Sequence, residues 1–600
     1  MTMTKPTLVL DTEVYRDYFL ASFLNVDTGN VRHFELYDGQ PLDVPTLRSI
    51  LGRYRIVTFN GNNFDLPVLS VAMGSGDPAA AKRVANKIIL NNMKHWQLGI
   101  EPPKCDHIDL IEVAPGIASL KIYGGRMHAP KMQDLPIDPE ASISPEDRAL
   151  LRQYCGNDLR TTLALFRKLE PQIKLRESMS AEYGVDLRSK SDAQIAEAVI
   201  VHEVEKRMGR KLEKQDPFRL AGQTFTYKSP GFLDMSTPEL SKIRDVLNTS
   251  VFTIGGNGVV TMPKEIADLK IKIGQSTYQM GIGGLHSTEK CAAHHSDDDH
   301  ILVDRDVASY YPAIILNCGL KPASMGDHFT AVYRSIVRRR LAAKRAGDKV
   351  VADSLKITIN GSSGKFGSPH SKLYSPTPLI QTTVTGQLSL LMLIEQLESE
   401  GIPVVSANTD GIVIKCPRDK IALMELIVLE WEVATGFETE ATEYLALYSR
   451  DVNNYVAIKP DGFKVKGVYA PAALQKNPTN EIVTTAVIEF LQKGIPVEQT
   501  ITSCRDITKF VSVRTVKGGA VKDGAYLGKA VRWYYALGEL GTINYKVNGY
   551  TVPRTEGAKP LMDLPEAFPD DVDLDWYIAE AQSILRDIGV NPNCITTNGL

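Results

Sequence analysis

Residues 302–312 are Leu-Val-Asp-Arg-Asp-Val-Ala-Ser-Tyr-Tyr-Pro, the stretch around which the rest of the chain is organised. The apolar run from Ile301 to Val303 predicts a buried strand that ends at Asp306, and Pro312 stops it because proline cannot pair inside a sheet. A carboxylate at the end of a buried strand can hold a hard divalent cation through its oxygens. An aspartate that caps a following helix would give the same pattern, so this motif alone leaves both interpretations open.

A second acidic motif lies downstream, in Asn408-Thr-Asp410-Gly411. This turn-forming sequence stands between apolar runs, which predicts a β-hairpin with Asp410 at its tip. Two strand-borne aspartates that converge can hold two Mg²⁺ ions, an arrangement that stabilises both oxygens of an in-line phosphoryl displacement. The two motifs together therefore favour the metal-site interpretation over the capping one.

The first third of the chain carries further carboxylates. Asp11 and Glu13 end an apolar run at i and i+2, so a strand would place both on one face. Asp65 follows a predicted strand and a polar turn, where it can also cap the next helix. Tyr154 and Asp158 are adjacent at i and i+4 of a predicted helix. Four carboxylates at one site would need cations, because uncompensated like charges raise each other's pKa.

The composition describes an ordinary soluble protein of several domains. The chain has 600 residues, too many for one hydrophobic core, and 43% of them are hydrophobic while 23% are charged. No apolar run is long enough to span a bilayer, so we expect no membrane segment and a cytoplasmic location, in the host cell if the protein is viral. The scattered cysteines are expected to be reduced thiols. The net charge of −3 means that nucleic-acid binding would require local clusters of Lys and Arg.

In order and spacing, these motifs resemble those of the family B DNA polymerases, particularly the compact bacteriophage members. The polymerase motifs of that family are Asp-x-x-Ser-Leu-Tyr-Pro, Lys-x-x-x-Asn-Ser-x-Tyr-Gly and Asp-Thr-Asp-Ser. Its exonuclease motifs are Asp-x-Glu, Asn-x-x-x-Phe-Asp and Tyr-x-x-x-Asp. The middle polymerase motif is here Lys356-Ile-Thr-Ile-Asn360-Gly-Ser-Ser-Gly364. The resemblance covers roughly residues 7–470.

The resemblance implies an α/β and α+β multidomain fold, in which a ribonuclease-H-like 3′→5′ exonuclease domain precedes a right-hand polymerase. The implied domains are the exonuclease (1–175), a connecting region on the palm side (176–300), the palm with the first motif (301–325), short fingers (326–367), the rest of the palm (368–470), and the thumb with the C-terminal tail (471–600).

For the exonuclease, the resemblance implies two Mg²⁺ ions bound by the four N-terminal carboxylates, Asp11, Glu13, Asp65 and Asp158, with Tyr154 orienting the attacking water. Asn60 and Phe64 would contact DNA. Lys131 lies where the protein-primed relatives carry a catalytic lysine, and the alternative is an ordinary surface lysine.

For the polymerase, the resemblance implies two further Mg²⁺ ions, for which Mn²⁺ can substitute, bound by Asp306, Asp410 and the Val307 carbonyl. Tyr311 would exclude a ribose 2′-OH. The residues implied to bind the dNTP are Tyr311, Arg340, Lys344, Lys356 and Asn360. Those implied to contact primer-template DNA are Gly283, Gly284, Tyr455, Lys466 and Gly467. A solvated face remains the alternative for the basic helix that carries Arg340, as a plain turn does for the glycine pair.

Four positions depart from the family pattern. Ser363 replaces a tyrosine that packs against the nascent base pair, and Gly361 replaces a serine. Asn408 replaces the first aspartate of the third motif, although the second one, Asp410, carries the metal. Asn453 replaces a lysine that contacts the primer strand. The departures at Gly361, Ser363 and Asn453 support an alternative, an exonuclease whose polymerase half has become a DNA clamp. A non-catalytic replisome scaffold is a third hypothesis.

The intervals between the polymerase motifs are too short for the long insertions of the protein-primed phage enzymes. We therefore expect extension of ordinary primers, without a terminal protein. The expected partners are primer-template DNA and dNTPs, and a phage helicase, primase and single-strand-binding protein are possible further partners.

Two other regions carry open interpretations. Residues 286–300 contain His286, Cys291 and further histidines, whose spacing fits no closed four-ligand zinc site. The candidate thumb is predicted to contain helices over 481–491 and 574–588. Its cations near Trp533 predict either a groove that follows a nucleic-acid backbone or buried aromatics under a basic rim.

Overall fold

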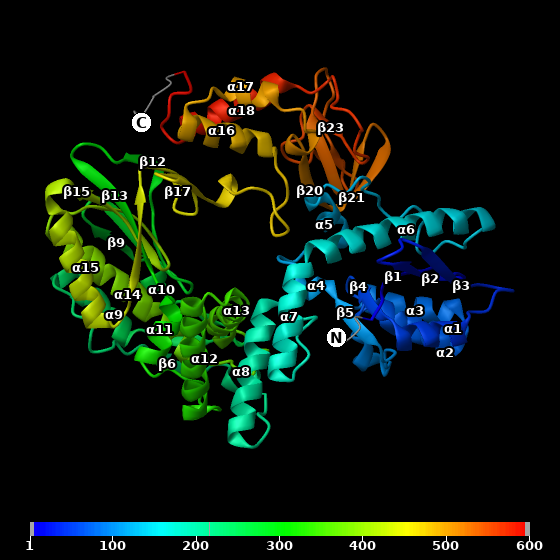
Figure 1. The fold of residues 1–600 in the computed structure, drawn as a ribbon, viewed down its shortest axis with the longest axis horizontal. Coiled ribbons are helices and arrows are strands. Elements are labelled where there is room, and N and C mark those ends of the chain that lie inside the picture. The colour runs from blue at the N-terminus through cyan, green and yellow to red at the C-terminus, as the bar shows by residue number, and fades with distance from the viewer. Residues whose placement is uncertain (1–4, 215, 594–600) are drawn as a thin grey trace.

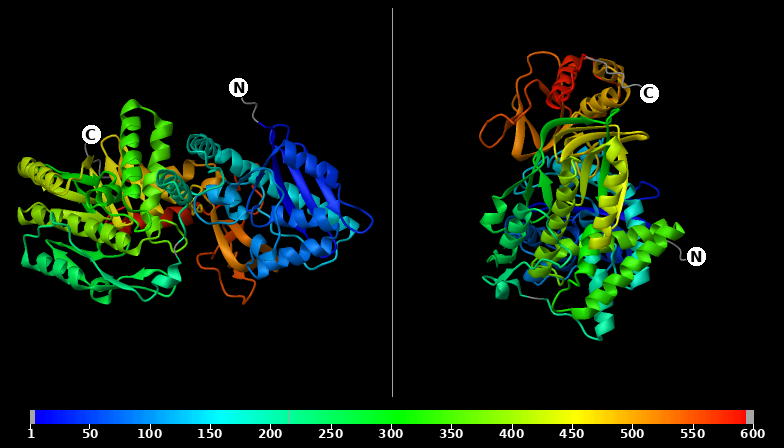
Figure 2. Two further views of the ribbon diagram at one scale, coloured as in Figure 1. Left: turned by 90° about the horizontal axis from the view of Figure 1, so that it is seen from below. Right: turned by 90° about the vertical axis from the view of Figure 1, so that its left-hand side faces the viewer.

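The computed structural model describes residues 5–214 and 216–593 (Figure 1). An N-terminal α/β unit (blue) lies on the right of Figure 1, and a large sheet with its helices (green and yellow) lies on the left. The C-terminal unit (orange and red) spans the top and reaches the N-terminal unit. The views in Figure 2 show the same units from below and from the side. Within the described ranges, no helix has the length and apolar character needed to cross a bilayer.

The N-terminal unit is built on a five-stranded mixed sheet. Its strands, in spatial order, are β3 (Val31–Leu36), β2 (Phe19–Asn25), β1 (Thr7–Val14), β4 (Arg55–Thr58) and β5 (Asp106–Asp109). β1 pairs antiparallel with β2 and parallel with β4. Such a sheet agrees with the expected α/β class. Its central strand, β1, carries Asp11 and Glu13.

Helices cover both faces of this sheet. They are α1 (Val44–Arg53), α2 (Asp65–Ser75), α3 (Pro78–Leu90), α4 (Leu110–Val113), α5 (Leu120–Arg126) and α6 (Pro145–Lys168). Leu8 and Leu10 of β1 share a core with α1, α2 and α3, whereas Val9 shares a core with α6. Because side chains alternate along a strand, Asp11 and Glu13 have the same parity as Val9 and face α6.

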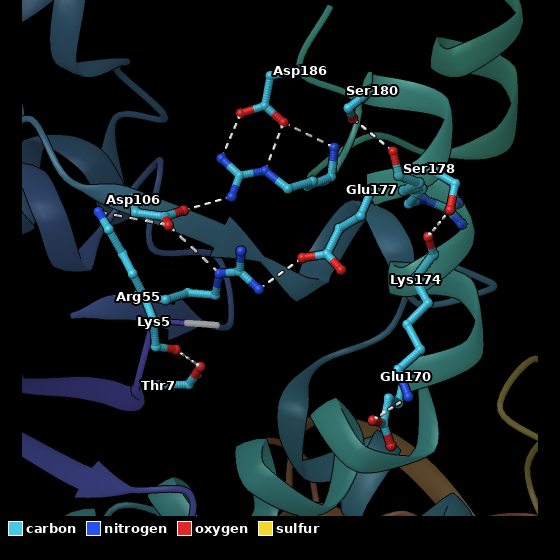
Figure 3. A network of polar contacts seen from close by, with 12 residues as sticks. Lys5, Thr7, Arg55, Asp106, Glu170, Lys174, Glu177, Ser178, Ser180 and Asp186 are labelled. Carbon is cyan, nitrogen blue, oxygen red and sulfur yellow. Dashed lines mark hydrogen bonds and ion pairs between the residues drawn. The ribbon is translucent and has the colours of Figure 1, made fainter. Parts of the chain in front are cut away.

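An ion-pair network fastens the next helix, α7 (Glu170–Tyr183), to the edge of the N-terminal sheet (Figure 3). Arg55 of β4 lies 2.7 Å from Glu177 and 3.7 Å from Asp106 of β5. Arg188 pairs with both Asp106 and Asp186. The boundary implied at residue 175 falls inside α7, because the chain leaves this unit along a continuous helix instead of a linker.

The large sheet has seven strands, and neighbouring strands pair antiparallel. In spatial order they are β16 (Thr439–Tyr444), β13 (His300–Val307), β15 (Gly411–Pro417), β14 (Val404–Asn408), β11 (Leu285–Ser287), β10 (Ser276–Met280) and β9 (Lys270–Ile273). β14 and β15 form the predicted hairpin, and Asp410 lies at its turn. Packed against the sheet are α11 (Tyr310–Asn317), α14 (Pro376–Ser399) and α15 (Ile421–Thr435).

Three helices form a separate layer below the large sheet in Figure 1. They are α8 (Asp192–Met208), α12 (Gly326–Ala346) and α13 (Lys349–Phe366), and a shared core joins them. The Ser191 side chain caps α8 as a capping box. A small sheet lies nearby, made of β6 (Thr224–Thr226), β7 (Val251–Ile254) and β8 (Val260–Thr261), with α9 (Pro238–Thr249) and α10 (Lys264–Ala267) in the same region.

A four-stranded sheet joins the large sheet to the C-terminal unit. Its strands, in spatial order, are β12 (Lys290–His295), β17 (Ala446–Asp451), β18 (Asn454–Lys459) and β19 (Gly462–Lys466). The C-terminal unit contains α16 (Glu481–Lys493), α17 (Val497–Ser503) and α18 (Leu574–Asp587), so both helices predicted there are confirmed.

The last sheet is built on a long hairpin. Its strands are β20 (Ser512–Lys522), β21 (Ala525–Tyr535), β22 (Asn544–Tyr545) and β23 (Ala558–Pro560). Trp533 and Arg532 of β21 are buried, so the groove interpretation of this segment is wrong for these two residues. They serve packing, and the exposed cations Lys517 and Lys529 form the rim.

Candidate active sites

The large sheet brings Asp306 and Asp410 together. β13 and β15 pair with Asp306 opposite Gly411, and the Val307 amide donates to the Asp410 carbonyl oxygen at 2.7 Å. A Cβ at position 411 would lie 2.3 Å from Asp306 Oδ1, so a side chain there would displace that carboxylate. Both aspartates line a cavity of about 280 Å³. We call this place the Asp306–Asp410 site.

Burial and like charges act on both carboxyl groups of this site. Burial raises the pKa of Asp306, and the charge of Asp304 raises it further, while Lys464 lowers it. Burial is also the largest cause of the raised pKa of Asp410, which the charge of Lys466 opposes. Closely placed carboxylates that resist ionisation are stabilised by hard cations with oxygen ligands. The residues present therefore fit a divalent-cation site.

An acid–base pair that sequence reasoning missed lies beside Asp306. Asp304 and Asp306 alternate on β13 and so face the same side of the sheet. Lys464 Nζ lies 2.8 Å from Asp304 and 3.4 Å from Asp306, and the Tyr444 hydroxyl also donates to Asp304. Burial lowers the pKa of Lys464, but the hydrogen bond and charge of Asp304 outweigh it, and the pKa is raised. In the sequence, Lys464 lies two residues before Lys466, so a strand places both lysines on the same face. This spacing could have indicated that Lys464 belongs to the site.

Two of the basic residues implied to bind the dNTP extend from α12 (Gly326–Ala346) to this end of the sheet. Arg340 Nη1 donates to Ser309 Oγ at 2.7 Å, and Ser309 lies in the left-handed region between β13 and α11. Lys344 Nζ lies 3.5 Å from Glu440, the residue that pairs with Asp306 across β13 and β16. Both side chains from α12 thus contact segments adjoining Asp306.

The other predicted dNTP residues are placed less closely. Lys356 and Asn360 are exposed at i and i+4 on α13, and no described contact joins either of them to Asp306 or Asp410. The Tyr311 hydroxyl donates to the Gly283 carbonyl oxygen, which joins the first polymerase motif to the glycine pair. Burial, and the charge of Asp410, raise the pKa of Tyr311 to about 12.

Two motif glycines are explained by close backbone approach. A Cβ at Gly284 would lie 2.9 Å from the Thr409 side chain, next to Asp410. Gly467 has φ of 65°, and a Cβ there would lie 2.2 Å from the Asn453 carbonyl oxygen. The packing of the chain against itself therefore suffices to require both glycines.

Two of the departures from the family pattern contact each other. Asn408 Nδ2 donates to the Val452 carbonyl oxygen at 2.9 Å and lies 3.3 Å from Asn453 Oδ1. Tyr455 pairs with Lys466 across β18 and β19 in the same region. Asn408 and Asn453 therefore form an uncharged contact. If only one of them were replaced by a charged residue, that charge would have no opposite charge at the other position.

Gly361 has a packing explanation. A Cβ at this position would lie 2.8 Å from Ala196 Cβ and 3.1 Å from Ala193 Cα on α8. Glycine therefore allows α13 to approach α8 closely, which a serine would prevent. Ser363 lies half-buried two residues further along α13.

The N-terminal carboxylate site (Asp11, Glu13, Asp65 and Asp158) forms between β1, α2 and α6. Ligand atoms of Asp11, Glu13 and Cys155 all lie within 4.8 Å of one another, and Asp65 Oδ1 accepts a hydrogen bond from Thr12 Oγ1 at 2.7 Å. Because this cluster spans three elements, its assembly depends on how α2 and α6 pack on the sheet.

The pKa values in this cluster are raised. Burial raises the pKa of Asp11 first, and the charges of Asp65 and Asp158 raise it further. Burial raises the pKa of Glu13 as well, followed by the charge of Asp11. For Asp65, burial raises the pKa to about 7 even though the Thr12 hydrogen bond lowers it. A cluster with this much unfavourable negative charge fits divalent cations.

The ammonium group of this site belongs to Lys121. Lys121 Nζ lies 3.5 Å from Asp158 Oδ2, donates to the Tyr154 hydroxyl, and lies 4.6 Å from the centre of the Tyr154 ring. Lys131 is exposed, and its backbone bridges to Asp563. In the part of the chain that the structure describes, Lys121 contacts this site, and the exposure of Lys131 agrees with the alternative of an ordinary surface lysine. Lys121 lies in the first turn of α5, ten residues before Lys131.

Asn60 and Phe64 shape the turn before Asp65. The Asn60 amide donates to Asp109 Oδ1 at 2.7 Å, and Asn60 has φ of 68°. The Phe64 amide donates to the Asn60 carbonyl oxygen, and Phe64 is half-buried at the start of α2. Asp109, which sequence reasoning did not single out, thus organises the turn that delivers Asp65.

The stretch 286–300 forms no metal cluster among the residues that the structure describes. It runs along β12 and turns into β13, with the His300 amide donating to Asp297 at 2.7 Å. These residues therefore have a structural explanation in the turn between two sheets.

Comparisons with known proteins give partial matches. No family model matches the chain. It is 27% identical over 145 residues to DNA polymerase 1 of Sulfurisphaera ohwakuensis, a match that covers 23% of this chain and 16% of that protein. It is 28% identical over 124 residues to DNA polymerase 1 of Sulfolobus acidocaldarius, which covers 20% of this chain and 14% of that protein. The chain thus spans about one sixth of the length of the curated relatives it matches.

A structure comparison matches the family B DNA polymerase from the hyperthermophilic archaeon Pyrobaculum calidifontis. The sequence identity is 16%, the TM-score is 0.41, and the match covers 99% of this chain and 78% of the other. Over these partial lengths the chain is thus similar in sequence to two proteins named DNA polymerase 1.

Proposed function

We propose that this protein is a template-directed DNA polymerase that adds dNTPs to a primer 3′-OH and removes nucleotides by a 3′→5′ proofreading exonuclease. The observation that supports it most is the meeting of Asp306 and Asp410 in one cavity, with cationic side chains around it. A separate carboxylate site in the N-terminal unit supports the second activity.

In the polymerase reaction, Asp306 and Asp410 would hold the divalent cations, Mg²⁺ or Mn²⁺. When bound, the cations lower the pKa of the primer hydroxyl and neutralise charge on the triphosphate. Arg340 and Lys344 provide fixed positive charge from α12 for the phosphates. Tyr311, held by its bond to the Gly283 carbonyl oxygen, forms the wall against which the sugar of the dNTP lies.

In the exonuclease reaction, Asp11, Glu13, Asp65 and Asp158 would hold the cations, which would supply Lewis-acid activation of the attacking water. Tyr154 accepts a hydrogen bond from Lys121, and its hydroxyl lies beside Asp158, where it would orient a water or phosphate oxygen. Lys121 adds a positive charge beside Asp158, where the charge of the scissile phosphate develops.

Single substitutions separate the two activities. Asp410→Ala is expected to abolish primer extension and to leave degradation of single-stranded DNA intact, and Asp11→Ala is expected to do the reverse. Both are measured on end-labelled oligonucleotides with Mg²⁺, with and without dNTPs. Degradation without any extension by the wild-type protein would favour an exonuclease with a DNA-clamp half, and loss of both activities from either change would contradict two separate sites.

The resemblance to compact phage enzymes leads us to propose a phage replisome in the host cytoplasm as the setting, with a helicase, a primase and a single-strand-binding protein as partners. The corresponding measurement is extension of an RNA or DNA primer on a long single-stranded template, with and without the single-strand-binding protein. Initiation on a protein hydroxyl would contradict the expectation of ordinary primers.

A further inference from the structure

A six-residue segment, 129–134, lies between the N-terminal carboxylate site and the C-terminal sheet. It follows α5, which begins with the residue before Lys121, and it precedes α6, which carries Tyr154 and Asp158. We call residues 129–134 the linking segment. Although it belongs to the N-terminal unit in sequence, most of its polar contacts are made with residues beyond position 520.

The backbone of the linking segment is bound almost residue by residue to the C-terminal unit. Arg532 Nη1 donates to the Ala129 carbonyl oxygen at 2.9 Å, and the Leu564 amide donates to the Pro130 carbonyl oxygen at 2.7 Å. The Met132 amide donates to the Met562 carbonyl oxygen at 2.8 Å, and Lys131 bridges to Asp563. Together these contacts pair the segment with residues 562–564 much as strands pair in a sheet.

Side chains reinforce this attachment. Asp134 Oδ2 accepts hydrogen bonds from the Tyr526 hydroxyl at 2.9 Å and from the Lys529 amide at 3.2 Å. A Cβ at Gly528 would lie 2.8 Å from Asp134 Cβ, so β21 approaches the segment closely there. Met132 is buried in a small core with Val513 of β20. Arg532 is fully buried, and its guanidinium spans the boundary between the two units.

One residue of the segment faces the opposite way. The Gln133 carbonyl oxygen accepts a hydrogen bond from Lys121 Nζ at 2.9 Å. The same ammonium group donates to the Tyr154 hydroxyl and lies 3.5 Å from Asp158. The direction in which Lys121 points therefore depends on where the Gln133 carbonyl is held, and its flanking residues, Met132 and Asp134, are held by the C-terminal sheet.

We infer that the C-terminal sheet positions Lys121 for phosphodiester hydrolysis by holding the linking segment, so that Asp134 and Tyr526 act as positioning residues of the N-terminal carboxylate site. This rests on the proposed exonuclease function. In chemical terms, the sheet fixes an acceptor that directs one N–H of the ammonium group away from the carboxylates. The remaining protons are then directed at Tyr154 and Asp158. Loosening the segment lets the ammonium group turn and costs rate without altering the cation ligands.

The variants follow from the contacts. Asp134→Ala removes the acceptor of both bonds to β21, and Asp134→Asn keeps an acceptor oxygen. Tyr526→Phe removes a single hydroxyl. The matched control is Tyr534→Phe, on the same strand, whose hydroxyl donates to Asp571 and not to the linking segment. Single-strand degradation and primer extension are measured for each variant at several substrate concentrations.

We expect Asp134→Ala to lower the kcat of degradation about tenfold with KM and primer extension unchanged, because misplacement of a catalytic group acts on the chemical step. Tyr526→Phe is expected to have a smaller effect in the same direction, while Asp134→Asn and Tyr534→Phe retain nearly the wild-type rate. In a Lys121→Met background, Asp134→Ala is expected to cause no further loss, because both changes remove the same interaction.

Three results would overturn the inference: wild-type degradation by Asp134→Ala, an equal loss in the wild-type and Lys121→Met backgrounds, or a parallel loss of primer extension. If the wild-type protein degrades no DNA, the proposed exonuclease function fails, and the inference fails with it. If the wild-type protein degrades DNA and Asp134→Ala does so equally well, the inference alone is wrong.

Discussion

At the scale of single residues, both sites combine carboxylates with a lysine that contacts them. Lys464 contacts Asp304 and Asp306 in the Asp306–Asp410 site, and Lys121 contacts Asp158 in the N-terminal carboxylate site. A lysine beside acidic groups offsets their repulsion before a cation or a substrate arrives. In the reactions proposed above, each lysine would also place a positive charge where phosphate charge develops.

Removal of Lys464 is expected to affect one site only. Lys464→Met leaves Asp304 buried with only the Tyr444 hydroxyl, so we expect primer extension to slow by at least tenfold and the free energy of unfolding to fall by about 1–2 kcal/mol. That is less than the ~3–5 kcal/mol for breaking a fully buried pair, because the lysine is 41% exposed. Extension assays and urea titration measure the two effects.

The control for this change is Lys459→Met, which removes a lysine from β18 that pairs with the exposed Asp461. It is expected to change neither quantity measurably. Equal losses from Lys459→Met and Lys464→Met, or a loss of single-strand degradation in Lys464→Met, would contradict a local role for Lys464.

Asp65 gives a pH-dependent prediction for the metal-free protein. Burial raises its pKa from 3.8 to about 7, so the folded state binds more protons than the unfolded state between those values. The contribution of protonated Asp65 to stability is complete below its pKa in the unfolded state. It is lost as the pH rises through its pKa in the folded state. In EDTA, the thermal midpoint of the N-terminal unit is therefore expected to fall between about pH 5 and about pH 8.

Scanning calorimetry measures this effect. Mg²⁺ at the upper end of the pH range is expected to restore the midpoint, because the cation replaces the missing protons. Asp65→Asn is expected to make the fall with pH shallower, since it removes one of the titrating groups. A midpoint in EDTA that rises with pH would show that the sign of the pKa shift is wrong.

At the scale of elements, α13 carries two predicted dNTP residues on its exposed face and a packing surface on the other. Lys356 and Asn360 lie on the exposed face, while Leu355 and Ile359 are buried. Gly361 sets how closely the helix approaches α8. The position of the exposed pair relative to the large sheet therefore depends on a contact made on the far side of the helix.

Substitution of Gly361 tests this dependence. Gly361→Ala is expected to destabilise the protein by about 1–3 kcal/mol, because the new methyl group overlaps Ala196. It is also expected to raise the KM for dNTPs as α13 shifts outward. Gly364→Ala is the matched control on the same helix, because a Cβ there meets no atom within 4 Å.

A compensating change sharpens the experiment. Adding Ala196→Gly to Gly361→Ala removes the closest overlapping atom and is expected to recover part of the dNTP affinity, though not all of it, because Ala193 stays close. If the KM for dNTPs responds to Gly364→Ala as strongly as to Gly361→Ala, the effect lies in the helix surface and not in its packing on α8.

At the scale of the whole molecule, the chain leaves the N-terminal unit along α7 and returns to it through the C-terminal sheet (Figure 1). The first connection is fastened by the ion pairs of Arg55 and Arg188 (Figure 3). The second includes Arg126 of α5, whose Nε donates to Asn477 Oδ1 at 2.7 Å and whose Nη1 donates to the Leu474 carbonyl oxygen at 2.5 Å. The N-terminal unit is thus held from both sides.

Arg126→Ala is expected to loosen the second connection. Two hydrogen bonds from a charged donor are lost, each of them contributing about 1.5–3 kcal/mol, so amides in residues 471–480 are expected to exchange faster with deuterium. Primer extension on short templates is expected to persist, because the Asp306–Asp410 site lies elsewhere. Arg160→Ala, at an exposed position of α6, is the control. Unchanged exchange in 471–480 would show that Arg126 does not hold this segment.

Much of the architecture was accessible from local patterns. Alternation and turn chemistry predicted the strand ending at Asp306 and the hairpin carrying Asp410, because a strand face and a turn are set within a few residues. The helices that begin at 481 and 574 were also predictable, because helical periodicity is set within a few residues. The boundary at residue 175 fell inside α7, because no composition change marks a helix that continues directly from the one before it.

The amino-acid sequence by itself determined which side chains have metal-binding chemistry and on which face of a strand or helix they stand, because those properties follow from residue type and from periods of two and 3.6. Only the tertiary structure decided which lysine joins each carboxylate cluster. Lys464 meets Asp304, and Lys121 meets Asp158, across separations in the chain that no local period encodes. Contacts between distant segments depend on how whole elements pack, and that packing is fixed by the sum of many weak burial contacts spread over the chain.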